Sequence, residues 1–286
     1  MPQAFFLPAS ATAGDQRLCL FHAAQAAAPR GLVVYVPPFA EEMNKARRMA
    51  ALQARALAQA GYSVLQTDLL GCGDSSGDFG DAGWQDWIED VRRACAWLRQ
   101  REPAAAGSPL WLWGLRAGCL LAAAAAPRLD EPAQLCFWQP MASGRLALQQ
   151  FLRLKLAGAL GSGNGAALME AMKQQLARGE SVEVAGYRLS AALASGLESA
   201  QLLPDAAARA TRLEWLELST QADAPPSPVS LKAQAQWQQA GYQVRSHRVQ
   251  GPAFWQTSEI EDAPALLPAT LAALQTPALV AQASAA

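Results

Sequence analysis

Short runs of apolar residues alternate along this chain with longer stretches in which apolar residues recur at helical spacing. The runs predict strands. They are Arg17–His22, Leu32–Val36, Ser63–Asp68, Leu110–Trp113, Leu135–Trp138, Leu213–Leu218 and Tyr242–Val249. The periodic stretches, each ended by glycine or proline, predict helices. These are Ala46–Ala60, Trp84–Glu102, Ala117–Ala126 and Ser230–Ala240. The alternation is typical of an α/β protein whose mostly parallel, twisted sheet is flanked by helices, with Arg17–His22 as an antiparallel edge strand.

Residues 144–204 interrupt this alternation. They contain two helical patterns, a short extended piece and a further helix opened by Ser190. We predict that they form a helical cap inserted between core segments 1–143 and 205–286. The insertion follows the strand that ends near Trp138, so it would lie over the carboxyl ends of the strands, where ligands bind in open α/β sheets.

Composition removes several classes of function. The 286 residues are 51% hydrophobic and 16% charged, and the formal net charge is −1, which gives no electrostatic basis for binding nucleic acid or acidic membranes. The longest apolar runs are shorter than the roughly 20 residues of a transmembrane helix, and the first residues lack the basic region of a signal peptide.

The cysteines and histidines indicate a cytoplasmic protein without a metal site. The 5 cysteines are scattered and odd in number, which fits reduced core thiols. With only 2 histidines, His22 and His247, we expect no metal centre, and we expect no cofactor.

The segment Trp111–Gly118 has the form of a nucleophile elbow but lacks the nucleophile. It reads Trp-Leu-Trp-Gly-Leu-Arg-Ala-Gly. A buried strand thus runs into a glycine-flanked turn that opens an alanine-rich helix, the context in which α/β-hydrolases expose a catalytic serine. The central residue is Arg116, and a guanidinium stays protonated and cannot attack a carbonyl. Arginine here argues against serine-hydrolase chemistry.

A second glycine motif strengthens the resemblance to α/β-hydrolases. Residues 68–77 read Asp-Leu-Leu-Gly-Cys-Gly-Asp-Ser-Ser-Gly. They resemble the Asp-x-x-Gly-x-Gly-x-Ser loop between the oxyanion-hole strand and the elbow of that fold. Asp74 and Ser75 are candidate ligand contacts, and hydrogen bonding within the loop is the alternative role for Ser75.

A third segment narrows the resemblance to one group. Residues 36–45 read Val-Pro-Pro-Phe-Ala-Glu-Glu-Met-Asn-Lys, after the strand whose loop supplies an oxyanion-hole donor. With Arg47-Arg48, both glycine motifs and Gly-Pro-Ala-Phe-Trp at 251–255, the chain resembles hydrolase 2 of the exosortase A system over essentially its full length. The resemblance implies a setting in bacterial exopolysaccharide synthesis, with a small-molecule or sugar-derived ligand.

The triad roles of that fold can be assigned by position. Arg116 takes the place of the nucleophile, and Asp223 lies at about the offset expected for the acid. The loop 251–255, expected to carry the base, contains no histidine. His247 lies four residues before Gly251, roughly 13 Å short of that turn at ~3.3 Å per strand residue. Two of the three roles are therefore empty.

Arg116 has two competing roles. A buried guanidinium needs a partner, so Arg116 could be a structural cation held by Glu41, Glu42 or Asp223. Alternatively, the guanidinium and the helix N-terminus after it would bind a phosphate or carboxylate. The residues that we expect to contact a ligand are Arg116, Phe39, Asn44, Leu115, Asp74, Ser75, Phe254 and Trp255.

Three functions remain open from the sequence. The first is a catalytically silent α/β-hydrolase-fold protein that binds a ligand or partner, since loss of triad members costs about 10⁶-fold in kcat. The second is a hydrolase or transferase in which Glu41 or Glu42 is the base and Arg116 an electrostatic clamp. The third is a module that recognises a phosphate or uronate anion. Homo-oligomer formation is left open by the sequence.

Overall fold

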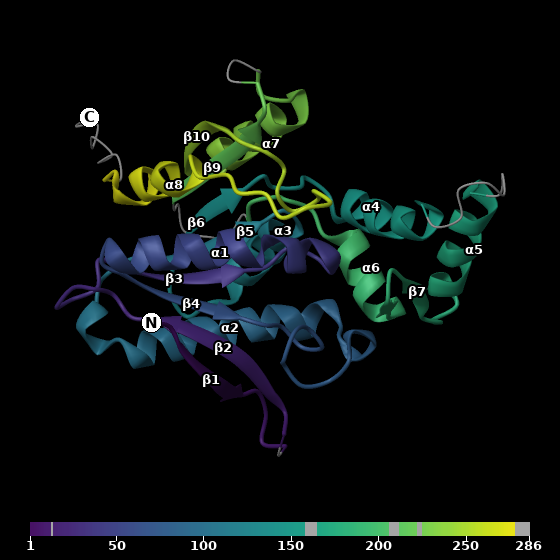
Figure 1. Ribbon diagram of the computed structural model, residues 1–286, viewed down its shortest axis with the longest axis horizontal. Coiled ribbons are helices and arrows are strands. Elements are labelled where there is room, and N and C mark those ends of the chain that lie inside the picture. The colour runs from purple at the N-terminus through teal and green to yellow at the C-terminus, as the bar shows by residue number, and fades with distance from the viewer. Residues whose placement is uncertain (13, 158–164, 206–211, 222–224, 278–286) are drawn as a thin grey trace.

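A mixed sheet of eight strands forms the centre of the molecule in the computed structural model, which describes residues 1–12, 14–157, 165–205, 212–221 and 225–277 (Figure 1). The strand order is β1-β2-β4-β3-β5-β6-β9-β10. Their bounds are β1 (Gln3–Pro8), β2 (Gln16–His22), β3 (Gly31–Val36), β4 (Tyr62–Thr67), β5 (Leu110–Leu115), β6 (Ala133–Trp138), β9 (Arg212–Ser219) and β10 (Gln243–Gln250). Pairing is parallel from β4 to β10, and β1 and β2 are antiparallel.

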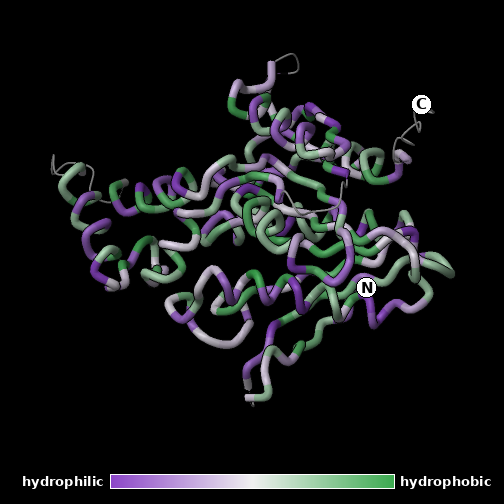
Figure 2. The backbone as a smooth tube through the Cα atoms, turned by 180° about the vertical axis from the view of Figure 1, so that it is seen from behind, coloured by the Kyte–Doolittle hydropathy of each residue, from purple (hydrophilic) through white to green (hydrophobic). Residues whose placement is uncertain are grey.

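Helices cover both faces of this sheet, as the alternating pattern predicts. One face carries α1 (Glu41–Gln59) and α8 (Leu266–Gln275). The other carries α2 (Trp84–Arg101), α3 (Ala117–Ala125) and α7 (Pro228–Gln239). Short 3₁₀ turns lie at Phe79–Asp81, Pro103–Ala105 and Ala126–Arg128. Hydrophobic residues run along the central strands, which separate two buried apolar cores (Figure 2).

The chain between β6 and β9 projects to one side of the sheet (Figure 1). It comprises α4 (Gly144–Ala157), α5 (Gly165–Ala177), the hairpin of β7 (Val182–Val184) and β8 (Tyr187–Leu189), and α6 (Ala191–Ser199). Ser190 caps α6, because its hydroxyl accepts a hydrogen bond from the Leu193 amide at 3.0 Å. α6 packs against both α4 and α2.

The predicted edge of the sheet is wrong. β1 pairs along the outer side of β2, so the edge is β1 and not Arg17–His22. The six residues of β1 are mostly exposed, but Leu7 is buried and Phe5 stacks on Trp97 with ring centroids 4.4 Å apart. Leu7 is the one buried residue of this six-residue strand, so the sequence of β1 shows no regular alternation of buried and exposed positions.

The predicted start of the first helix is also wrong. α1 begins at Glu41 rather than at Ala46, which places Glu41, Glu42 and Asn44 on its first turns. Ala40 precedes α1 with φ 50° and ψ −119° and provides no side-chain cap, so the usual signal for a helix start is missing.

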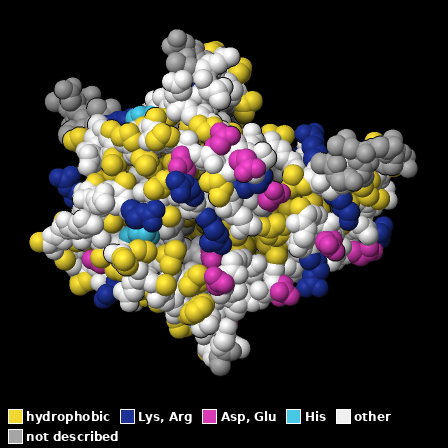
Figure 3. Space-filling model, viewed as in Figure 1, with side chains coloured by type: hydrophobic (Ala, Val, Ile, Leu, Met, Phe, Trp, Pro, Cys, Tyr) yellow, Lys and Arg dark blue, Asp and Glu magenta, His cyan; other side chains and the backbone are white. Residues whose placement is uncertain are grey.

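The described residues contain no helix long and apolar enough to cross a membrane. Over the same ranges, no group of three or more His, Cys, Asp or Glu side chains is placed to hold a metal ion. All five cysteines are free and buried. Charges of both signs are interspersed on the face shown in Figure 3.

Candidate functional site

The predicted elbow is present at the end of β5. Arg116 connects β5 to α3 with φ 56° and ψ −120°, a backbone conformation that residues other than glycine rarely adopt. The flanking glycines are required by close packing. A Cβ at Gly118 would lie 2.3 Å from the Val36 carbonyl oxygen, and one at Gly114 would lie 2.8 Å from Cys119 Cα. The sharp turn therefore persists with arginine at its centre.

Glu42 is the ion-pair partner of Arg116. Arg116 Nε donates to Glu42 Oε1 at 3.2 Å, and Nη2 donates to Gln150 Oε1 at 2.9 Å. The guanidinium carbon lies 5.2 Å from the centroid of the Trp255 ring, within cation–π range. Of the other acids considered, Glu41 pairs with Lys45 at 3.2 Å, and Asp223 lies outside the described residues.

The Arg116–Glu42 pair is enclosed but only loosely bonded. The side chains are 12% and 24% exposed, and a single contact joins them. Burial raises the pKa of Glu42 above its ordinary value, and the nearby Arg116 charge opposes that effect only in part. Within the described residues, no side chain donates to Glu42 Oε2. This carboxyl group can therefore accept a hydrogen bond from a ligand.

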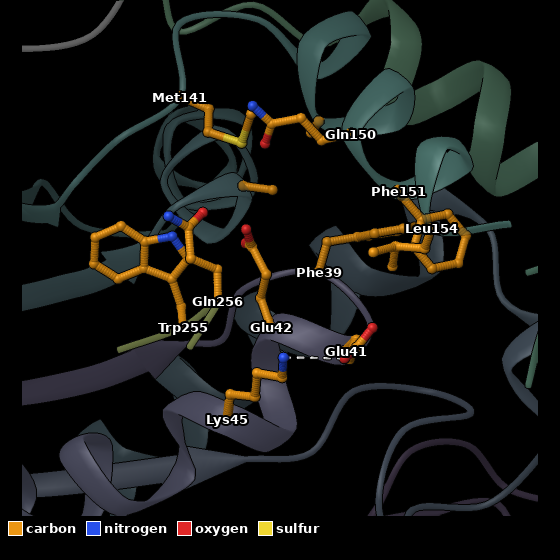
Figure 4. A pocket seen from close by; sticks show the side chains of 12 residues that line it. Phe39, Glu41, Glu42, Lys45, Met141, Gln150, Phe151, Leu154, Trp255 and Gln256 are labelled. Atoms are coloured by element: carbon orange, nitrogen blue, oxygen red, sulfur yellow. Dashed lines mark ion pairs between the residues drawn. The ribbon is translucent and has the colours of Figure 1, made fainter. Parts of the chain in front are cut away.

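A cavity of about 340 Å³ lies beside Glu42. In Figure 4 the Glu42 carboxyl group points into this space, with Trp255 on one side and Phe39 and Phe151 on the other. We call it the first cavity, and it is lined by Phe39, Glu41, Glu42, Lys45, Ala117, Met141, Ala147, Gln150, Phe151, Leu154, Trp255 and Gln256. Its size and mixture of aromatic and polar walls suit a small-molecule ligand.

A second cavity, of about 410 Å³, adjoins Arg116. Its wall is formed by Arg116, Gln139, Pro140, Met141, Ala142, Leu146, Gln150, Trp215, Glu217, Leu218, Ser219, Pro225, Ser227, Val229, Ser230 and Arg248. Met141 and Gln150 line both cavities, so the Arg116–Gln150 hydrogen bond lies at their boundary.

Two of the expected ligand contacts, Phe39 and Trp255, line the first cavity, whereas Phe254 and Asn44 are not in its wall. Phe39 is buried in its wall, and its ring lies 5.1 Å from that of Phe151. Trp255 lines the same cavity, while Phe254 lies behind it, only 1% exposed and packed on Trp138. Asn44 donates to the Tyr187 hydroxyl at 2.8 Å and so joins α1 to the β7–β8 hairpin.

The structure places Leu115, Asp74 and Ser75 away from both cavities, since none of these described residues is in either wall. Leu115 is fully buried in the core under α1 and α8. The Ser75 hydroxyl donates to the Asp68 carbonyl at 2.6 Å, which is the bonding within the loop that was its alternative role. Asp74 is exposed in the same loop.

Trp255 lies next to Arg116 on the loop where the fold would place a base. His247 lies within β10, where Nε2 is 2.5 Å from Oε2 of the fully buried Glu214. Both cysteines near the glycine motifs are also unsuited to nucleophilic attack. Burial raises the pKa of Cys72 to about 12, and burial raises the pKa of Cys119 well above its ordinary value.

Gln150, Met141 and Gln256 are site residues that sequence reasoning missed. Gln150 extends from α4 to Arg116, 34 positions away along the chain. The only available signal was the polar pair Gln149-Gln150 within an otherwise periodic helix.

The fold and the elbow define the class: this is an α/β-hydrolase fold, with a mostly parallel sheet flanked by helices. The chain belongs to the family described as serine aminopeptidase, S33, whose profile matches residues 27–223. No curated protein matches it.

Solved structures with the same fold span nearly the whole chain. Est1E from Butyrivibrio proteoclasticus with bound ferulic acid is 16% identical, with 96% of this chain and 100% of that chain covered and a TM-score of 0.64. GrgF, an alpha/beta hydrolase from Penicillium sp. sh18, is 17% identical, with 96% and 98% covered and a TM-score of 0.58. XC6422 from Xanthomonas campestris, a serine hydrolase without a lid, is 15% identical, with 98% and 97% covered and a TM-score of 0.54.

Proposed function

We propose that this protein is a family member without serine-hydrolase catalysis that binds a small ligand in the first cavity. The observation that carries the proposal is the Arg116–Glu42 pair, which occupies the elbow beside a 340 Å³ cavity. Trp255 contacts Arg116 from the loop 251–255, and this loop contains no histidine, so the expected positions hold neither a serine nucleophile nor a histidine base. On the sequence resemblance, we place this role in the cytoplasm, in exopolysaccharide synthesis of the exosortase A system.

The walls of the first cavity favour a neutral ligand rich in hydroxyl groups, such as a sugar derivative. The charges in or beside it cancel as two pairs, Arg116 with Glu42 and Lys45 with Glu41. Trp255 supplies an aromatic ring for an apolar ring face. Glu42 and the amides supply hydrogen-bonding groups that match hydroxyls.

We further propose that residues 144–204 act as a cap over the core segments 1–143 and 205–286. Support comes from the first cavity, to which α4 contributes Gln150 and Phe151 and α1 contributes Glu42. A ligand there would touch both parts of the chain.

The proposal is tested by a turnover assay and a binding assay. Short-chain acyl esters should not be hydrolysed above the rate seen with Arg116→Ala, and turnover that Arg116→Ala abolishes would overturn the proposal. Calorimetric titration with neutral methyl glycosides should show binding. Leu154→Trp, which fills the first cavity, should abolish it, whereas Arg153→Trp, on an exposed α4 position outside the wall, should not. Absence of glycoside binding would exclude the sugar assignment.

A second candidate function, supported by the raised pKa of Glu42, is hydrolysis with a rearranged site. Glu42 would deprotonate a water in the first cavity, and Arg116 would stabilise developing negative charge. Glu41 is less suited because it is paired with Lys45 and 37% exposed. If this mechanism operates, Glu42→Gln should lower ester turnover by about 100-fold or more. Equal rates in the two proteins would exclude it.

A third role, anion recognition at Arg116, has one supporting observation. Nε and Nη2 have acceptors, but in the described part of the chain Nη1 has none. The guanidinium therefore has a donor to spare for a ligand.

A further inference from the structure

The second cavity brings an incompletely used guanidinium to a partly apolar space. Arg116 lies in its wall together with Leu146 and Val229, whose side chains are among the exposed large hydrophobic residues. The Nη1 donors of Arg116 have no acceptor among the described residues. A ligand with an acceptor group and an apolar body would satisfy both parts of this wall.

The N-terminus of α7 lies at the same cavity. Ser227 caps this 12-residue helix by accepting a hydrogen bond from the Ser230 amide at 3.0 Å, and both serines line the cavity. The first amides of a helix carry a partial positive charge. Arg116 adds a second, independent feature to the same wall, because its Nη1 donors have no acceptor among the described residues.

The acid in this cavity already has partners. Glu217 is only 6% exposed, and it accepts hydrogen bonds from the Ser230 hydroxyl and from Arg248 Nη1, the latter at 3.1 Å. The charge of Arg116 is balanced by Glu42, and that of Arg248 by Glu217. The positive potential that remains in the cavity comes from the N-terminus of α7, which is equivalent to less than one elementary charge. A singly charged anion fits this field, whereas a dianion would be repelled by Glu217 and by Glu42 nearby.

We propose that the second cavity binds a small organic monocarboxylate. Its carboxylate accepts hydrogen bonds from Arg116 Nη1 and lies near the N-terminus of α7, and its apolar part packs on Leu146 and Val229. This inference rests on the proposed function, because Arg116 acts here as a binding group at the position of the missing nucleophile.

The test uses benzoate as the probe, and calorimetry measures its binding at two salt concentrations. Benzoate should bind saturably and more weakly at high salt, and the neutral isostere benzamide and inorganic phosphate should each bind at least tenfold more weakly. Arg116→Met should weaken benzoate binding at least tenfold. Val229→Trp should fill the cavity and abolish binding, whereas Leu231→Trp, an exposed position of α7 outside the wall, should leave it unchanged.

Four results would overturn the inference: no benzoate binding, benzamide binding of equal strength, tighter binding of phosphate, or benzoate binding that Val229→Trp leaves intact. Thermal unfolding of each variant shows whether it is folded. Failure here is separable from failure of the proposed function. Glycoside binding that is sensitive to Leu154→Trp would survive a negative benzoate result, whereas ester turnover dependent on Arg116 would contradict the proposed function itself.

Discussion

Among the sites where a carboxylate pairs with a guanidinium, two differ clearly in what surrounds the pair. At the elbow, Glu42 makes one contact with Arg116 beside a cavity. Between β9 and β10, Glu214 is fully buried and lies within 4.0 Å of Arg212, Arg245 and His247. Arg212 also donates to the Ala273 carbonyl of α8 and lies over the Trp111 ring, 5.0 Å from its centroid.

The difference separates a structural ion cluster from a ligand site. Both carboxylate oxygens of Glu214 have protein partners, and Glu214 lines neither the first nor the second cavity. Glu42 and Arg116 each retain unfilled bonding capacity at a cavity. Ion pairing by itself therefore does not make Arg116 structural, and free volume next to the pair is the distinguishing feature.

The largest expected effect is at the buried cluster. Glu214→Gln should lower the free energy of unfolding by about 3–5 kcal/mol, because it leaves the buried Arg212 charge without a compensating carboxylate. Urea denaturation measures the loss. The control is Glu198→Gln, which removes a pair between side chains that are 67% and 50% exposed and should change stability by less than about 1 kcal/mol. If the two variants lost the same free energy of unfolding, Glu214 would contribute no more to stability than an exposed ion pair does.

A smaller loss is expected at the elbow. Arg116→Ala should lower the free energy of unfolding by about 1–2 kcal/mol, since the pair has one 3.2 Å contact and Glu42 borders a cavity. The same urea measurement applies. A loss as large as that of Glu214→Gln would mean that Arg116 is mainly structural.

The burial of Glu42 should affect how the free energy of unfolding depends on pH. Because the pKa of Glu42 is raised on folding, the folded state binds this proton more tightly than the unfolded state. Wild-type stability should therefore fall, relative to Glu42→Gln, as pH rises from the ordinary glutamate pKa through the raised one. Urea midpoints of both proteins between about pH 4 and 8 would measure the difference. A constant difference, or a relative gain with rising pH, would contradict it.

The smallest expected effect is on catalysis. Arg116→Ser restores the hydroxyl of the elbow but should give no esterase activity, because Trp255 and not a histidine lies beside position 116. The measurement compares the rate of ester hydrolysis by Arg116→Ser with the rate by Arg116→Ala. Turnover by the serine variant alone would show that another group acts as the base.

The elbow could be predicted from the sequence, but the residues that contact Arg116 could not. Gly114 and Gly118 mark a turn that tolerates no Cβ, and that requirement is local. The choice among the acids depended on where α1 begins, and Ala40 carries no capping side chain to show it. The contact with Gln150 depends on how α4 packs, which no local pattern encodes. The edge strand β1 was missed because Leu7 is the one buried residue among its six, which leaves no alternating pattern in the sequence.

The backbone at Arg116 also makes this position useful for protein engineering. A residue held at φ 56° carries a strain of about 1–3 kcal/mol, and the strain arises from Cβ, so every side chain larger than glycine bears a similar cost. β5, α3 and the packing of Gly118 against Val36 fix the turn independently of the guanidinium. In a saturation library at position 116 the backbone turn would thus stay the same in every variant. The library would compare the effects of different side chains placed at the boundary of the two cavities.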